Sequence, residues 1–189
     1  MEGPRLLLAA IPDAVTLQGL SASFASTGLA AQAGGDLSPS RNWHQSLSDR
    51  YNDTPENRRL LMEAGALVKA APFVLGFNRF ECKGKPGKFH WSLRPSKTPP
   101  AFDALLNAIK AALAARRIDE DHGHSAHVSV SYWAKAKPDN RPIPAVLWRI
   151  SEFMLLRGDG HGDAYQYQEL ARWPLTAQPE GQLDFFGGL

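Results

Sequence analysis

The chain has 189 residues, of which 43% are hydrophobic and 10% aromatic, and this is enough to bury a core in one compact unit. Its formal net charge of +2 is too small for a dedicated duplex-binding domain, and no apolar run approaches the roughly 20 residues of a membrane span. The apolar run Leu6–Ile11 is too short for a secretory signal. We therefore expect a cytoplasmic protein without a membrane segment, and a monomer. A single cysteine, Cys82, excludes an internal disulfide and a zinc cage made of cysteines.

In the first part of the chain, apolar spacing predicts two extended segments and two helices. Residues 5–11 have the length and composition of a strand, and Pro12-Asp13 then suits the first turn of a helix. Residues 43–47 alternate as a strand does. Thr54-Pro55 is a helix start with an apolar stripe behind it, and Pro72 ends that helix.

The second part predicts a hairpin, a helix and three further strands. The expected strands are residues 73–80, 88–93, 148–156 and 165–173, together with the second motif strand that follows the loop Asp119–Ser125, and the expected helix begins at Pro99-Pro100. Each half of the chain therefore reads roughly as strand, helix, strand. This order indicates a mixed α and β fold with helices outside, a pseudo-two-fold repeat, and two sheet faces lining a groove. We expect residues 1–175 to form a single domain with two lobes, followed by a tail at 176–189.

One four-residue pattern occurs once in each half of the chain, as His44-Gln45-Ser46-Leu47 and as His127-Val128-Ser129-Val130. In a strand, residues two apart share a face, so each copy displays an imidazole beside a hydroxyl. A third copy, His90-Trp91-Ser92-Leu93, shows that the pattern alone is weak. The placement of the other two copies, on either side of a helix, a hairpin and a second helix, favours two surfaces that face one another.

The arrangement of these two copies resembles the two-histidine (2H) phosphoesterase superfamily, in particular its bacterial 2′-5′ RNA ligase or RNA 2′,3′-cyclic phosphodiesterase branch. The segments that carry the resemblance are Arg5–Pro12, Asn42–Leu47, Ala71–Phe73, Phe89–Trp91, Ala126–Val130 and Tyr165–Leu175. The resemblance implies an α+β fold in which two antiparallel sheets, arranged as two pseudo-symmetric lobes, line a central cleft.

Two imidazoles suit the opening of a cyclic phosphate, because a pKa near 6.5 allows one to be neutral and the other protonated. The resemblance implies that His44 protonates the leaving 3′ oxygen and that His127 takes a proton from water, which leaves a 2′-phosphate. Run in reverse, the same groups would join 2′-5′ RNA ends. Ser46 and Ser129 would donate hydrogen bonds to phosphate oxygens, and the scheme needs no metal and no cofactor. The expected partners are RNA ends or nucleotides that bear a cyclic phosphate, as in RNA processing.

Two departures from the branch lie next to the motifs. The branch often has an arginine where this chain has Tyr132, and Ser48-Asp49-Arg50-Tyr51 replaces the usual apolar residues and glycine after the first motif. The departures leave open a small nucleotide substrate, such as ADP-ribose cyclic phosphate. A protein that binds RNA ends without catalysis is the alternative from another functional class, although both motifs are complete.

Other side chains have an open role at this stage. His90 and Ser92 share a strand face and could contact ribose or phosphate, or belong to the core or surface. Trp43, Tyr132 and Trp133 could stack on a base, as aromatic side chains do in single-stranded recognition, or simply pack.

Two further segments suggest partners. The loop Asp119–His124 suggests a metal site through His122, His124 and His127, and a solvated loop is the alternative. A metal-dependent hydrolase would then be inhibited by chelators. Near the C-terminus, Gln182-Leu183-Asp184-Phe185-Phe186 resembles the short peptide by which bacterial proteins dock on the DNA sliding clamp. A tail packed on itself is the alternative.

Overall fold

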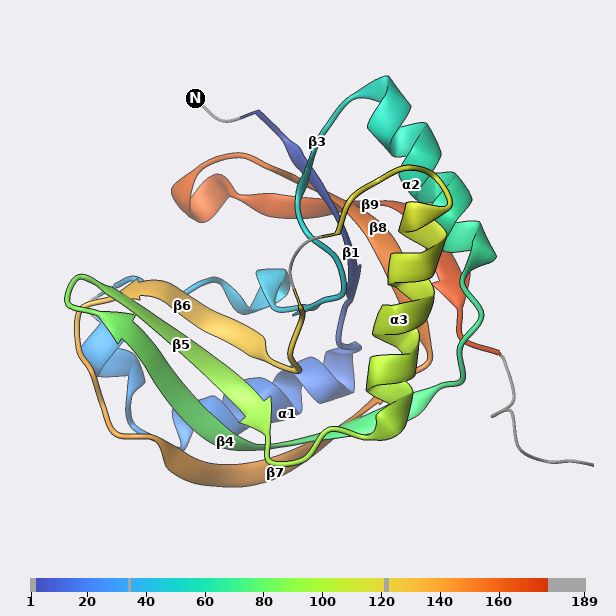
Figure 1. Cartoon of the computed structure of the whole chain (residues 1–189). Coiled ribbons are helices and arrows are strands. Elements are labelled where there is room, and N and C mark those ends of the chain that lie inside the picture. The colour runs from blue at the N-terminus through green and yellow to red at the C-terminus, as the bar shows by residue number, and fades with distance from the viewer. Residues whose placement is uncertain (1–2, 34, 121–122, 177–189) are drawn as a thin grey trace, which may run out of the picture.

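The computed structural model describes residues 3–33, 35–120 and 123–176, which form two antiparallel sheets and three α-helices (Figure 1). The strands are β1 (Arg5–Ala10), β2 (Gln45–Ser46), β3 (Tyr51–Asn52), β4 (Phe73–Lys85), β5 (Lys88–Pro95), β6 (Val128–Ala134), β7 (Arg141–Ile150), β8 (Glu152–Asp159) and β9 (Gln166–Pro174). The helices are α1 (Ala14–Ala25), α2 (Pro55–Leu67) and α3 (Pro100–Ala114). The predicted α+β class with two antiparallel sheets is confirmed.

Each sheet ends in one of the two motif strands. The first sheet has the order β2-β1-β8-β9, with β3 pairing to the other end of β1, and the second has the order β6-β5-β4-β7. β2 and β6 are therefore edge strands, and each histidine of the double motif directly precedes one of them. At the opposite edge of the second sheet, β7 contains Pro142 and Pro144. Prolines are tolerated there because an edge strand does not need every N–H for pairing.

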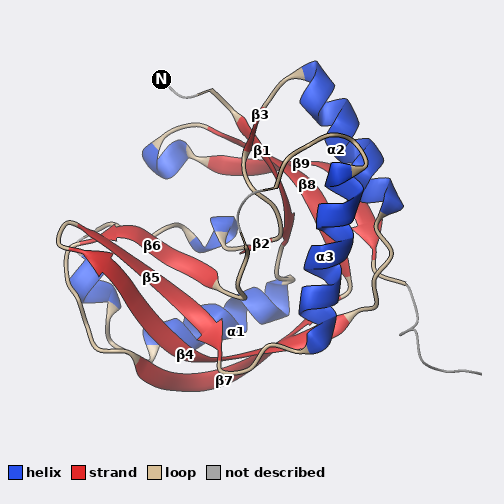
Figure 2. Cartoon of the chain, viewed as in Figure 1, coloured by secondary structure: helices blue, strands red, loops and turns tan. Residues whose placement is uncertain are grey.

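The helices begin where the sequence predicts, and each start has a local cause. Asp13 caps α1 by accepting from the N–H of Thr16 at 2.8 Å, and Thr54 caps α2 by accepting from Asn57 at 3.1 Å. Helix α3 has proline at its first turn. In Figure 2, α2 and α3 lie side by side at one side of the molecule, and α1 lies along the second sheet, where it contacts β7. Helix α2 lies so close to β9 that a Cβ on Gly65 would be 2.5 Å from the Trp173 ring.

One buried hydrophobic cluster draws on both sheets and all three helices. Its members include Leu8, Leu20, Leu61, Phe77 and Leu105. The two sheets, which with their connecting loops are called the first and second lobe below, therefore share one core. Within the described residues, no helix has both the length and the apolar composition needed to cross a membrane.

Two predictions about the strands are wrong in detail. Residues 148–156, predicted as one strand, are divided at Ser151 between β7 of the second sheet and β8 of the first. Both halves contribute buried apolar side chains, Trp148 and Ile150 before the break and Phe153 and Leu155 after it, so the apolar pattern continues across Ser151. The first motif strand is also shorter than the predicted 43–47, and it leaves His44 in the segment just before β2. The tail segment Gln182–Phe186 lies outside the described residues.

Candidate active site

His44 is a buried imidazole whose Nδ1 is fixed by the backbone. Only 8% of the residue is exposed, and its Nδ1 lies 2.7 Å from the carbonyl oxygen of Asn42. A carbonyl can only accept, so Nδ1 carries the hydrogen and Nε2 is the nitrogen left to gain or lose a proton. The ring of Tyr167 meets His44 edge-on, with centroids 4.8 Å apart.

His127 repeats the arrangement in the other lobe. Its Nδ1 lies 2.8 Å from the carbonyl oxygen of Ser125, again two residues earlier in the chain. The same reasoning leaves Nε2 as its reactive nitrogen. The two histidines of the double motif thus have the same orientation relative to their own strands, as a pseudo-two-fold site requires.

Gln45 joins the two motifs across the lobes. Its side chain is fully buried, and its Oε1 accepts from the backbone N–H of His127 at 2.7 Å. Its Nε2 donates to the carbonyls of Ser46 at 2.8 Å and Ser125 at 3.2 Å. The residue that follows the first histidine therefore holds the backbone that carries the second.

A cavity of about 380 Å³ opens between the lobes beside this junction. His44, Arg50 and Tyr167 line it from the first lobe, and Ser129 and Tyr132 line it from the second. The remaining lining residues are Gly35, Asp36, Leu37, Ser38, Pro39, Asn42, Trp133, Gly162 and Tyr165. The volume falls in the range of small-molecule sites.

On the β6 side, His127 is not among the residues that line the cavity; it is linked to the cavity through His90, which contacts both His127 and the lining residue Ser129. The Oγ of Ser129 lies 2.7 Å from Nε2 of His90. The His90 ring stacks on Tyr132 with centroids 5.0 Å apart, and meets His127 edge-on at 5.6 Å. The sequence-predicted residues His90, Ser129, Tyr132 and His127 are therefore brought together.

Two other sequence-predicted residues are placed differently. Trp43 is a correction: its indole is buried in the core, packs edge-on against Phe24 and donates its N–H to the Ser38 carbonyl at 3.0 Å. It supports the cavity wall and is not available to stack on a base. Ser46 is half-buried, pairs with Ala9 of β1, and is not among the residues that line the cavity.

Burial controls the protonation of all three histidines. Desolvation lowers the pKa of His44 to about 4, and the charges of Arg50 and His127 act in the same direction. The pKa of His90 is also lowered to about 4, first by desolvation and then by the charge of His127. Desolvation lowers the pKa of His127 as well, and its hydrogen bond to Ser125 opposes the shift.

Comparison with solved structures identifies the fold. The chain resembles Escherichia coli LigT in apo form (TM-score 0.70, 18% identity, 93% of this chain and 99% of that chain) and LigT complexed with 3′-AMP (TM-score 0.74, 18% identity, the same coverage). It also resembles TT0787 of Thermus thermophilus (TM-score 0.72, 19% identity, 92% of this chain and 99% of that chain). The chain has the fold of LigT. No family model and no curated protein sequence gave a match.

Two tyrosines that no sequence motif marks also lie at the site. Tyr167 contacts His44, and the phenol oxygen of Tyr167 accepts from Arg50 at 3.0 Å. Tyr165 packs edge-on against Tyr167, and its hydroxyl fits over Gly158, where a Cβ would lie 2.0 Å from it. The only sequence signal was Arg50, which belongs to the unusual segment after the first motif. The tyrosines are more than 100 positions away from that segment.

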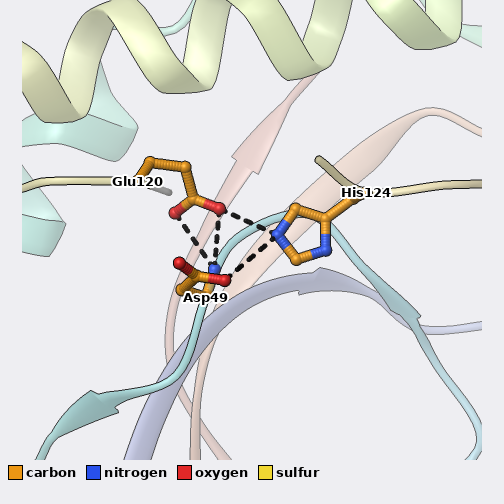
Figure 3. A group of neighbouring side chains, drawn as sticks. All are labelled: Asp49, Glu120 and His124. Carbon is orange, nitrogen blue, oxygen red and sulfur yellow. Dashed lines mark hydrogen bonds and ion pairs between the residues drawn. The ribbon is translucent and has the colours of Figure 1, made fainter. Parts of the chain in front are cut away.

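The loop before the second motif forms a polar cluster with the segment after the first (Figure 3). Asp49, Glu120 and His124 offer ligand atoms within 4.8 Å of one another, and within the described ranges they are the one group with metal-ligand spacing. Of the predicted combination of His122, His124 and His127, His122 lies outside the described residues, and within them His124 is grouped with Asp49 and Glu120 and not with His127.

Hydrogen bonds within this cluster connect the two loops, and we call the cluster the Glu120 brace. Both carboxylate oxygens of Glu120 lie 3.0 Å from the backbone N–H of Asp49. One oxygen also accepts from the Tyr51 hydroxyl at 2.5 Å and the other faces Nε2 of His124 at 2.8 Å. Burial and the hydrogen bond to Glu120 raise the pKa of Tyr51. The cluster thus ties the segment after His44 to the loop before His127.

Proposed function

We propose that this chain is a 2H phosphoesterase acting as a metal-independent RNA 2′,3′-cyclic phosphodiesterase that opens a terminal cyclic phosphate to a 2′-phosphate. The observation that carries the proposal is the matched pair of imidazoles. In each imidazole, Nδ1 forms a hydrogen bond with the carbonyl oxygen two residues earlier in the chain. The side chain of Gln45, next to His44, accepts a hydrogen bond from the backbone N–H of His127. Such a pair can give one proton and take another in a single displacement.

In the proposed reaction, a water oxygen forms a bond to phosphorus as the bond from phosphorus to the 3′ oxygen breaks. Nε2 of His127 takes the proton from water, and Nε2–H of His44 delivers a proton to the leaving 3′ oxygen. The product is a 2′-phosphate with a free 3′ hydroxyl. Each transfer contributes about 10²- to 10⁴-fold in rate. When a 5′ hydroxyl attacks in place of water, the same two roles give a 2′-5′ phosphodiester and a free 3′ hydroxyl, which is 2′-5′ RNA ligation. In the reverse sense the roles exchange and the cyclic phosphate forms again.

The cavity supplies the groups that a phosphodiester needs. The hydroxyl of Ser129 donates to a nonbridging oxygen from the cavity wall, and Ser46 has no part in this step because it does not line the cavity. The guanidinium of Arg50 lines the same cavity and supplies positive charge next to His44. Tyr132 and Trp133 are 42% and 56% exposed, so their rings are available to a base.

Nucleotides are the substrate class that the comparisons favour. Solved structures of LigT hold 3′-AMP, ATP or NADP+. A small nucleotide such as ADP-ribose cyclic phosphate is therefore the second candidate. It is favoured by an adjoining pocket of about 260 Å³ that shares Arg50, Gly162 and Tyr165 with the main cavity. That pocket also contains Arg5 and His161, which suit a second phosphate.

Turnover measurements test the proposal. Wild type, His44→Ala and His127→Ala should be compared on 2′,3′-cyclic mononucleotides, on RNA ending in a cyclic phosphate, and on ADP-ribose cyclic phosphate, all in EDTA. We expect wild type to produce 2′-phosphates and each variant to lose about 10²-fold or more in kcat. Unchanged turnover in either variant would remove that histidine from the mechanism. Tight binding of RNA ends without any turnover would favour the noncatalytic alternative.

A further inference from the structure

His90 is held from three directions at a place that does not line the cavity itself. Its ring lies flat on Tyr132, with an angle of 7° between the planes, and stands at 84° to the ring of His127. Its Nε2 reaches across from β5 to the Ser129 hydroxyl on β6, at 2.7 Å. These contacts fix the ring, so the direction of this hydrogen bond determines what Ser129 can do.

We propose that His90 is a positioning residue that donates from Nε2–H to the Oγ of Ser129 and so leaves the Ser129 hydrogen for the substrate phosphate. This inference rests on the proposed function, because it assigns His90 a role that acts through Ser129. It differs from the role suggested by sequence alone, in which His90 contacts ribose or phosphate directly.

The direction of the hydrogen bond follows from what a serine hydroxyl can offer. If Ser129 donated to His90, only oxygen lone pairs would face the cavity, and these repel a phosphate oxygen. If His90 donates, the single hydroxyl hydrogen points into the cavity, which Ser129 lines. An anion in the cavity favours the second arrangement, since hydrogen bonds to ionised acceptors are the stronger ones.

The burial of His90 agrees with this assignment. Because its pKa is well below neutrality, His90 is a neutral imidazole with a single N–H in the working pH range. The ring can therefore donate from Nε2 without adding a further positive charge near His127, Arg94 and Lys83, whose charges already act on it.

Serine also needs such a partner more than threonine would. A β-branched side chain has a restricted χ1 angle, whereas the hydroxyl of serine rotates among three wells. At Ser129, the hydrogen bond from His90 takes over the restriction that a γ-methyl group would provide. A Ser129→Thr substitution should therefore make His90 dispensable.

The test is a double-mutant cycle on kcat and KM for a 2′,3′-cyclic mononucleotide. His90→Phe keeps a flat ring against Tyr132 but removes the donor, and we expect kcat to fall about tenfold. In the Ser129→Ala background the same substitution should change kcat by less than about twofold, and in the Ser129→Thr background most of the activity should return. Equal losses in all three backgrounds would overturn the inference.

Two further measurements do not depend on turnover, and the first needs only the wild-type protein. Side-chain ¹⁵N NMR of the wild-type protein with inorganic phosphate should show a protonated Nε2 in His90, and an unprotonated Nε2 would overturn the inference. In the second measurement, His90→Phe should weaken the affinity for inorganic phosphate in the wild-type background and have little effect in the Ser129→Ala and Ser129→Thr backgrounds, as expected for kcat. Coupling in phosphate binding without any cyclic phosphodiesterase activity would retain the role of His90 and reject the proposed function.

Discussion

The side-chain oxygen of Gln45 accepts the backbone N–H of His127 at 2.7 Å, so a residue of the first motif holds the second motif in place. Gln45 is fully buried and also donates to the Ser125 carbonyl, which in turn faces Nδ1 of His127. The Gln45 amide therefore links the backbone of His127 directly to the first motif, in addition to the core that the two sheets share. In a buried polar network of this kind, each polar group that loses its partner lowers the stability of the folded protein.

Replacing Gln45 with leucine tests this link. The substitution keeps the approximate volume but leaves the N–H of His127 without its partner, which should reduce the free energy of unfolding by about 1–3 kcal/mol. We also expect kcat to fall about tenfold or more with less change in KM, because a misplaced base affects the chemical step more than binding. Urea unfolding and steady-state kinetics give the two quantities.

The matched control is Gln168→Leu on the exposed surface of β9. Its effect on stability should stay within about 0.5 kcal/mol. If Gln45→Leu behaved like this control in both measurements, the amide would not be what joins the motifs.

The pH profile of activity should reflect two histidines with lowered pKa values. In the proposed reaction the active free enzyme has protonated His44 and neutral His127, and burial lowers both pKa values. The maximum of kcat/KM, which reports the free enzyme, should therefore lie below pH 6.5. A bound phosphodiester anion raises both pKa values, so the maximum of kcat should lie at higher pH. The apparent values would belong to the coupled pair, and coincident maxima would contradict the prediction.

Arg50 lines the cavity and also affects the pH profile of activity through His44. Its positive charge lowers the pKa of His44, so Arg50→Gln should raise that pKa and move the maximum of kcat/KM to higher pH. Loss of a charged donor from the cavity should also raise KM about tenfold. Arg59→Gln, an exposed arginine paired with Glu63 on α2, serves as the control and should change neither quantity. A rise in KM without a shift in the profile would separate Arg50 from His44.

Stability should also depend on pH through His44. Its folded pKa of about 4 lies below the ordinary 6.5, so the unfolded chain binds more protons between these values. Stability should therefore be lost as pH falls from about 6.5 towards 4, by about 3 kcal/mol from this group. His44→Gln removes the group, and its unfolding free energy should fall correspondingly less over this interval. Parallel pH curves for the two proteins would show that the buried imidazole is not responsible.

The sequence predicts those features of the fold and of the site that depend on neighbouring residues, and it does not predict those that depend on how distant segments pack. Thr54 before Pro55, and Pro99-Pro100, mark helix starts that the structure has, because caps and prolines act within one turn. The repeated four-residue pattern also selects His44 and His127, because a histidine and a serine two positions apart can be recognised from neighbouring residues alone. Burial of Trp43 and the break at Ser151 depend on which sheet faces which, and no local pattern carries that information.

The same limit explains the parts of the site that the sequence did not reveal. Tyr167 contacts His44 and Arg50 from more than 100 residues away, and Glu120 reaches Asp49 across 71 positions. These contacts become visible only once β9 and the loop before β6 are placed in space. Tyr and Glu residues are too common for their sequence context to mark them.

The Glu120 brace gives the last prediction. Glu120→Gln keeps the shape but removes the charge that accepts from Asp49, Tyr51 and His124, so we expect a loss of about 1–3 kcal/mol in unfolding free energy. The pKa of Tyr51, which Glu120 raises, should move back towards its ordinary value, as measured by ultraviolet titration of the phenol. Because hydrogen bonds account for both carboxylate oxygens, EDTA should change neither the melting temperature nor kcat of the wild type. A fall in either quantity that Zn²⁺ or Mn²⁺ restores, and that Glu120→Gln abolishes, would instead make Asp49, Glu120 and His124 a metal site.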